Sequence, residues 1–234
     1  MSEIVEAFIT AVYLIITLDP EVAEIAIRSV TISALATFFA SLICIPVGGL
    51  IYFHNFRGKR AVISAIQTLF SLPTVVVGLF VFLMLSRVGP LGIFGLLFTP
   101  WGMVIGQTVL ISPIILGFTI SALSGVGKEI RDTTISLGAT RIQAIIVIIK
   151  EVKFAIMSTV LLGFGRAISE VGIAMMIGGN IKGFTRVLTS AIALETAKGD
   201  IVLGIALGII LMMLALVATI LVNIFMRRME PEFV

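Results

Sequence analysis

Residues 29–53 read SVTISALATFFASLICIPVGGLIYF, a run of 25 residues without a charged side chain. As a helix rising 1.5 Å per residue this run extends over about 37 Å, more than the roughly 30 Å hydrocarbon core of a bilayer. The rest of the chain has the same character, since 59% of its 234 residues are apolar and only 12% are charged, with a mean hydropathy of +1.22. Soluble chains are about 25% charged. The sequence therefore predicts an integral membrane protein and excludes soluble enzymes and nucleic-acid binders.

The run is preceded by a helix start at Asp19-Pro20-Glu21, because Asp can cap a helix, Pro suits its first turn and Glu favours the positive end of its dipole. Before it, the apolar stretch 7–18 is too short to cross a bilayer comfortably. We therefore expect an interfacial helix within residues 1–18, with a first spanning helix as the alternative. The N-terminus has neither a basic leader nor a small-residue cleavage site, so no signal peptide is expected.

Four further apolar segments follow the first one, separated by polar or Gly- and Pro-containing breaks. Thr99-Pro100 predicts the start of one of them, by a side-chain cap and a proline in the first turn. The five expected spans are about 29–53, 61–86, 101–123, 154–177 and 201–226. The expected fold is an all-α, polytopic bundle forming one domain over residues 19–234, with five spans, or six if residues 4–18 cross.

Basic residues predict the orientation of this bundle. Ten of the sixteen Lys and Arg lie in 54–60, 124–153 and 227–234, which five spans place on one side of the membrane. Cytoplasmic loops carry the excess of Lys and Arg. We therefore expect a multi-pass protein of the cytoplasmic membrane with its N-terminus outside and its C-terminus in the cytoplasm.

Catalytic and metal-binding chemistry are not indicated. The chain has one histidine, His54, and one cysteine, Cys44, so neither a metal-ligand cluster nor a Cys–His or Ser–His nucleophile pair is expected. The string Gly125-Val126-Gly127-Lys128 is not a phosphate loop, because Ala122 stands at the position of its first glycine and Glu129 at that of its Ser or Thr. We expect a protein that is not an enzyme and that binds no cofactor or metal itself.

Charged and polar residues are concentrated in the expected cytoplasmic loop, residues 124–153. Residues 128–141 read as a charged helix, then Gly138, which can end that helix or allow another backbone to approach closely. Residues 142–149 are aliphatic and lead back to the membrane. On these residues alone, the alternative interpretation is a solvated loop with a surface helix.

The same loop resembles the EAA loop of ATP-binding-cassette (ABC) importer permeases, with Asp132-Thr133-Thr134 followed by Gly138 at the expected spacing. It departs from that pattern in having Thr-Thr for Ala-Ala and Lys150-Glu151 where many members have Leu-Pro. The continuation, GFGRAISEVG over residues 163–172 and GGNI over 178–181, resembles the MetI-like, binding-protein-dependent permeases for sulfate, molybdate and tungstate. Together with TRVLT at 185–189, it looks most like the tungstate branch.

This resemblance implies a homodimeric permease subunit of an ATP-driven importer for a tetrahedral oxyanion, most closely tungstate, with molybdate or sulfate as alternatives. It further implies two copies of an ABC ATPase, which would hold ATP and Mg, and an extracytoplasmic oxyanion-binding protein. The cytoplasmic loop would be the coupling helix that docks on the ATPase. The residues implied in that contact are Glu129, Asp132, Gly138, Ala139 and Arg141.

Two charged residues lie inside the fourth expected span. Arg166 and Glu170 are four residues apart and so share one helix face. A charge at the centre of a spanning helix costs about 2.5–3.5 kcal/mol and usually faces a protein interior or a watery path. The two residues either neutralise each other or line a translocation path. Outside the membrane, Lys182 and Arg186 either draw an anion toward the mouth of such a path or contact lipid headgroups.

A stand-alone channel or secondary transporter is the remaining alternative. Secondary transporters commonly show inverted repeats and several intramembrane ionisable groups. The sequence has no evident duplicated segment and one intramembrane charged pair. Five spans are also few for an ion-coupled carrier, so an ATP-driven subunit is favoured.

Overall fold

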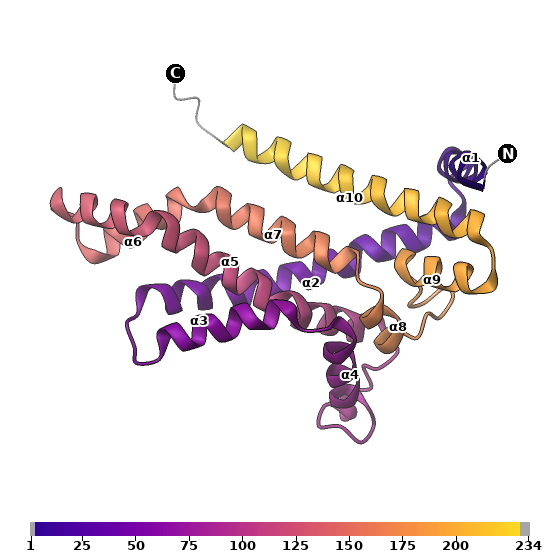
Figure 1. Ribbon diagram of the computed structural model, residues 1–234, viewed down its shortest axis with the longest axis horizontal. Coiled ribbons are helices and arrows are strands. Elements are labelled where there is room, and N and C mark those ends of the chain that lie inside the picture. The colour runs from indigo at the N-terminus through magenta and orange to yellow at the C-terminus, as the bar shows by residue number, and fades with distance from the viewer. Residues whose placement is uncertain (1–2, 230–234) are drawn as a thin grey trace.

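The computed structural model is built of helices that run mostly along its longest axis (Figure 1). It describes residues 3–229, and within that range the side chains of all residues except 126–129, 131, 141 and 225–229. The helices are α1 (Glu3–Ile16), α2 (Pro20–Phe53), α3 (Lys59–Thr68), α4 (Thr74–Leu85), α5 (Pro100–Ser136), α6 (Arg141–Glu151), α7 (Lys153–Ile168), α8 (Gly172–Gly178), α9 (Leu188–Lys198) and α10 (Ile201–Met229), with short 3₁₀ turns η1 (Leu69–Ser71) and η2 (Gly92–Phe94). The prediction of an all-α bundle of apolar helices is confirmed.

The long helices start where their capping residues predict. Asp19 Oδ1 accepts hydrogen bonds from the main-chain nitrogens of Glu21 and Val22, at 3.1 and 3.0 Å, and Pro20 is the first residue of α2. Thr99 Oγ1 accepts from Gly102 N at 3.2 Å at the start of α5. These side chains satisfy main-chain donors that have no partner within the helix.

Two of the expected spans are broken rather than straight. Three helices, within α2, α5 and α10, are long and apolar enough to cross a membrane. The number of spans rises to as many as five if each of two bent helix pairs is counted as one span. The expectation of a single helix over 61–86 is wrong, because α3 with η1 meets α4 at 100°. Leu72 is extended there, as a residue before Pro73 tends to be, and a helix cannot continue through it. In the fourth span α7 and α8 meet at 60° across residues 169–171.

The third span and the charged segment after it form one helix. We expected the span to end near Leu123 and a separate coupling loop to follow, but α5 continues without interruption to Ser136. The sequence between Leu123 and Ser136 contains no strong signal for the end of a helix. The helix ends only before Gly138, where φ is +87°. Gly138 N donates to Ile135 O at 2.9 Å and Ala139 N to Thr134 O at 3.0 Å, the Schellman arrangement that terminates a helix.

The N-terminal helix α1 lies across the bundle, seen end-on beside α10 in Figure 1. Its 14 residues extend over about 21 Å, too short to cross a bilayer core. Ala7 and Ala11 are fully buried in the bundle, whereas Phe8 and Ile16 are exposed. This geometry favours the interfacial helix over a sixth span.

Small residues let the central helices pack closely. In the centre of the bundle, Ala40 and Cys44 of α2 pack in one buried cluster with Ile111 and Ile115 of α5. A Cβ at Gly106 of α5 would lie 2.5 Å from Ile177 Cδ1 and 2.7 Å from Ile173 Cγ2, both in α8. The broken end of the fourth span is therefore pressed directly against α5.

Candidate functional site

The charged pair inside the fourth span sits at the break between α7 and α8. Arg166 Nη1 donates to Glu170 Oε2 at 2.7 Å, so the predicted i, i+4 neighbours do form an ion pair. The other carboxylate oxygen accepts from the main-chain nitrogens of Gly172 and Ile173, at 2.9 and 3.3 Å. Glu170 therefore caps α8 and balances Arg166 at once.

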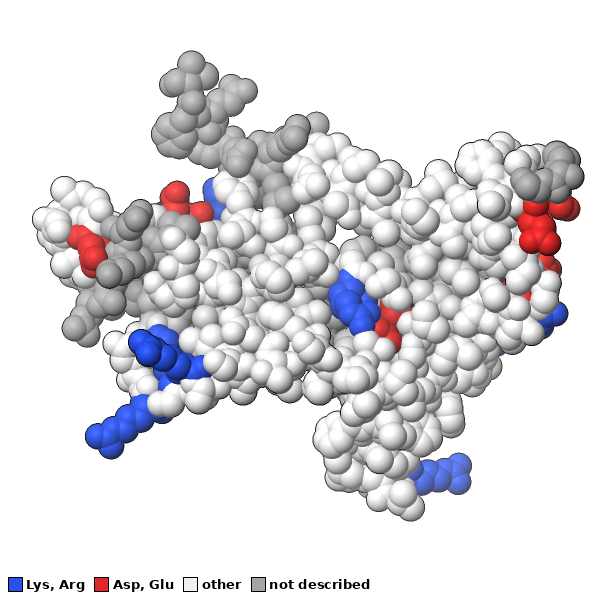
Figure 2. Space-filling view, viewed as in Figure 1, with Lys and Arg blue, Asp and Glu red and all other residues white. Residues whose placement is uncertain are grey.

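The two partners differ in their access to the outside. The Glu170 side chain is 3% exposed and the Arg166 side chain 33%. Of the five donors of a guanidinium, the pair with Glu170 uses one, and the Arg166 side chain makes no other hydrogen bond or ion pair with the described residues. Figure 2 shows charged residues at both ends of the molecule's long axis. Between the two ends, one basic and one acidic side chain lie in contact on the face in view. The Arg166 guanidinium is therefore partly exposed, whereas the Glu170 carboxylate is buried and bonded to both Arg166 and α8.

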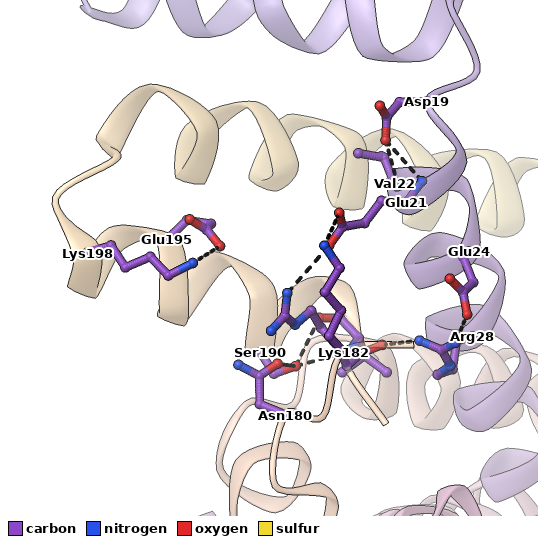
Figure 3. Close-up of polar contacts among 12 residues, drawn as sticks. Asp19, Glu21, Val22, Glu24, Arg28, Asn180, Lys182, Ser190, Glu195 and Lys198 are labelled. Carbon is purple, nitrogen blue, oxygen red and sulfur yellow. Dashed lines mark hydrogen bonds and ion pairs between the residues drawn. The ribbon is translucent and has the colours of Figure 1, made fainter. Parts of the chain in front are cut away.

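Lys182 and Arg186, the candidate anion mouth, lie together in the connection between α8 and α9. Both face Glu21 of α2, with Lys182 Nζ 2.7 Å from Glu21 Oε2 and Arg186 Nη1 3.5 Å from Oε1 (Figure 3). They border a cavity of about 320 Å³ whose charged rim also includes Glu195 and Lys198. The mouth is thus a mixed-charge surface rather than a purely cationic one.

The coupling segment forms the tip of the α5–α6 hairpin, at the opposite end of the bundle from α9 (Figure 1). Asp132 and Gly138 are exposed there and Ala139 is partly buried, while the side chains of Glu129 and Arg141 lie outside the described residues. Thr140 starts α6 with a capping box, since its Oγ1 accepts from Gln143 N and Gln143 Oε1 accepts from Thr140 N. The hairpin is therefore closed by local interactions on both sides of Gly138.

Sequence reasoning missed two features of these sites. Leu137 and Ile142 are 83% and 71% exposed at the tip and flank Gly138 with apolar surface. Arg28 contacts the connection between α8 and α9, more than 150 residues away in sequence. The only local signal for Arg28 was Glu24 one helical turn earlier, and the two residues are indeed paired. Among the described residues, no group of His, Cys, Asp or Glu could hold a metal ion.

Comparison with known proteins gives consistent matches over nearly the whole chain. Residues 25–231 match the family described as binding-protein-dependent transport system inner membrane component. The tungstate uptake system permease protein TupB of Peptoclostridium acidaminophilum is 44% identical over 92% of this chain and 94% of its own length. TupB of Campylobacter jejuni is 35% identical over 92% and 90%. A solved structure of inward-facing MetNI, a methionine ABC transporter, superposes with a TM-score of 0.74 at 18% identity, covering 92% of this chain and 99% of that one, which shows a shared fold.

Proposed function

The chain belongs to the family of binding-protein-dependent transport system inner membrane components, and we propose that it is the permease subunit of an ABC importer for tungstate. The observation that carries this function is the near full-length similarity to two tungstate uptake permeases. Relatives named for molybdenum or sulfate share 28% identity or less. The chain is a multi-pass protein of the cell membrane, and its role is transport rather than catalysis.

The tip of the α5–α6 hairpin is the contact for the ATPase in this proposal. Exposed Leu137 and Ile142 supply apolar surface, Gly138 ends α5 between them with a positive φ, and Asp132 supplies charge at the rim. Two ATPase subunits, one on each copy of a homodimer, would hold ATP and Mg and push on the tip. This arrangement requires the tip in the cytoplasm, as the excess of basic residues predicts, with the N-terminus outside and the C-terminus inside.

The anion would enter at the other end, delivered by an extracytoplasmic binding protein. Lys182 and Arg186 would meet it at the mouth, with Glu21 limiting their net attraction. Farther along, Arg166 would line the path, because its guanidinium is accessible and has donors to spare. Glu170 would keep the site from holding the anion too tightly.

Molybdate is the second candidate substrate, since tungstate, molybdate and sulfate are all tetrahedral dianions. A guanidinium recognises their shared charge and oxygen geometry, so selection among them falls mainly on the binding protein. The similarity to tungstate permeases favours tungstate.

Reconstitution tests this proposal. The permease is purified with its ATPase, placed in vesicles with the binding protein outside, and assayed for ATP-dependent tungstate uptake in competition with molybdate and sulfate. We expect uptake that needs ATP and both partners, and loss of ATPase co-purification in Gly138→Glu. Anion uptake by the chain alone would instead identify a channel or secondary transporter.

A further inference from the structure

Arg28 of α2 holds the connection between α8 and α9, residues 179–187. Its Nη1 donates to Arg186 O at 2.9 Å and its Nη2 to Gly183 O at 3.1 Å, while Nη2 also contacts Glu24 (Figure 3). A guanidinium suits this task because its donors project in a fixed fork, which an ammonium lacks. The Arg28 side chain itself is only 15% exposed, and its contact with Arg186 O is partly buried, whereas those with Gly183 and Glu24 lie at the surface.

The second link between α2 and the connection is weaker. Glu21 pairs with Lys182 at 2.7 Å, but these side chains are 47% and 68% exposed, and although Arg186 is only 16% exposed its contact with Glu21 is long, at 3.5 Å. Exposed ion pairs contribute little, because water and salt screen them. Arg28 is therefore the main charged contact between α2 and the connection.

The connection is braced internally by buried hydroxyl groups. Thr185 Oγ1 donates to Gly178 O at 2.5 Å, at the end of α8, and accepts from Ile181 N at 3.0 Å. Ser190 Oγ donates to Asn180 Oδ1 at 2.8 Å. Thr185 and Ser190 are both fully buried. These bonds tie the connection to the end of α8 and to the start of α9.

Further bonds extend from α2 to the break in the fourth span. Ser29 Oγ, next to Arg28, accepts from Leu188 N at 2.8 Å. Thr189 Oγ1, one residue later, donates to the main-chain carbonyl of Glu170 at 2.9 Å. The start of α9 is thus bonded both to α2 and to the residue that pairs with Arg166.

We propose that Arg28 is a positioning residue for import. By its contacts, the outer end of α2, the 179–187 connection and α8 move as one body. Docking of the binding protein is thereby transmitted to the break at Arg166 and Glu170. The span then flexes at the break between α7 and α8, across residues 169–171, where the helix is interrupted. This inference rests on the proposed importer function.

The test compares basal ATPase rate, its stimulation by oxyanion-loaded binding protein, and uptake in the reconstituted complex. For Arg28→Gln we expect an assembled complex with unchanged basal rate but stimulation and uptake about tenfold lower, an ordinary size for coupling between sites. Arg28→Lys should recover part of the loss, because an ammonium can reach one carbonyl but cannot reproduce the fork. Arg57→Gln removes the same charge from the loop between α2 and α3, at the opposite end of the bundle, where Arg57 is exposed, and should behave as wild type.

A second pair of variants serves if Arg28→Gln does not assemble. Thr189→Val removes the bond to Glu170 while keeping the side-chain shape, and Thr189→Ser keeps the hydroxyl. We expect stimulation to fall in the first variant and persist in the second. Wild-type stimulation in Arg28→Gln would overturn the inference. If Arg28→Gln cannot be assembled, wild-type stimulation in Thr189→Val would overturn it instead. A wild-type complex that shows no oxyanion-dependent stimulation would instead overturn the proposed function.

Discussion

Arg166 and Glu170 form a 2.7 Å ion pair in which the carboxylate is buried and the guanidinium remains one-third exposed. The asymmetry separates their roles. Glu170 has its oxygens filled by Arg166 and by two main-chain donors of α8. Arg166 keeps donors that the described residues do not use, so the same pair stabilises the break and presents a cation to the face of the bundle.

Removing the buried partner should destabilise the fold strongly. Glu170→Ala leaves Arg166 unpaired and the start of α8 uncapped; because one-third of the Arg166 side chain is exposed, we expect a loss of up to about 3 kcal/mol, below that of a fully buried pair. Glu170→Gln can still accept hydrogen bonds and should lose less. Thermal unfolding of the purified protein in detergent measures both. Glu195→Ala, which breaks an exposed i, i+3 pair, is the control and should change stability by less than about 1 kcal/mol; equal losses in all three variants would contradict the capping role.

Removing the exposed partner should instead affect transport. Arg166→Gln abolishes the cation but can still donate a hydrogen bond to Glu170, so the complex should assemble. We expect ATP-dependent uptake to fall about tenfold, equivalent to roughly 1.4 kcal/mol, with partial retention in Arg166→Lys. Uptake is compared at equal amounts of assembled complex. Normal transport by assembled Arg166→Gln would show that the pair is structural only.

Close packing of α5 on α8 predicts a sharp difference between two glycines. Gly106→Ala places a methyl group against Ile173 and Ile177, and overpacking of this kind costs about 1–3 kcal/mol. Gly49→Ala in α2 meets nothing within 4 Å and should be neutral or stabilising through helix propensity. Unfolding temperatures of the two variants check this. If both were equally stable, α8 would not be pressed against α5 as described.

The parts of the fold that were predictable depend on local chemistry. Asp19 and Thr99 predict helix starts because each side-chain oxygen accepts a hydrogen bond from a free main-chain N–H within the next turn. Gly138 predicts a helix end because a positive φ is accessible to glycine at little cost. The run of α5 to Ser136 was missed, since continuation of a helix past a membrane boundary leaves no local signal.

The parts that were not predictable depend on contacts between distant residues. Leu72-Pro73 indicates a break, but its 100° angle depends on what packs against α3 and α4. Arg28 and the 179–187 connection lie more than 150 residues apart, as do Glu21 and Lys182. Nothing near Lys182 or Arg186 indicates that a carboxylate of α2 will partly neutralise them. The pairing of both residues with Glu21 was therefore not predictable, and their role as an anion mouth stays a prediction.

Apolar exposure at the hairpin tip predicts a selective loss of partner binding. Leu137→Asp should leave the unfolding temperature nearly unchanged, because the side chain is 83% exposed. A charge in an apolar contact should reduce ATPase co-purification about tenfold or more. Val88→Asp alters a residue that is 96% exposed outside the tip and serves as the control. Undiminished ATPase binding by Leu137→Asp would exclude this surface as the docking site.

Substitutions of Gly138 distinguish two reasons for a glycine at the tip. One is termination of the helix, and the other is close approach of a partner backbone. Its φ of +87° disfavours Ala by about 1–2 kcal/mol, whereas Asn adopts this conformation more readily despite its larger side chain. Apart from its two chain neighbours, no described atom comes within 4 Å of a Cβ built there, so the described residues leave space for a side chain that a partner would have to fill. We expect ATPase co-purification to fall more in Gly138→Ala than in Gly138→Asn, with Gly125→Ala unaffected as a control in open space. The reverse order, Asn weaker than Ala, would mean that the partner's close approach rather than the helix end requires glycine.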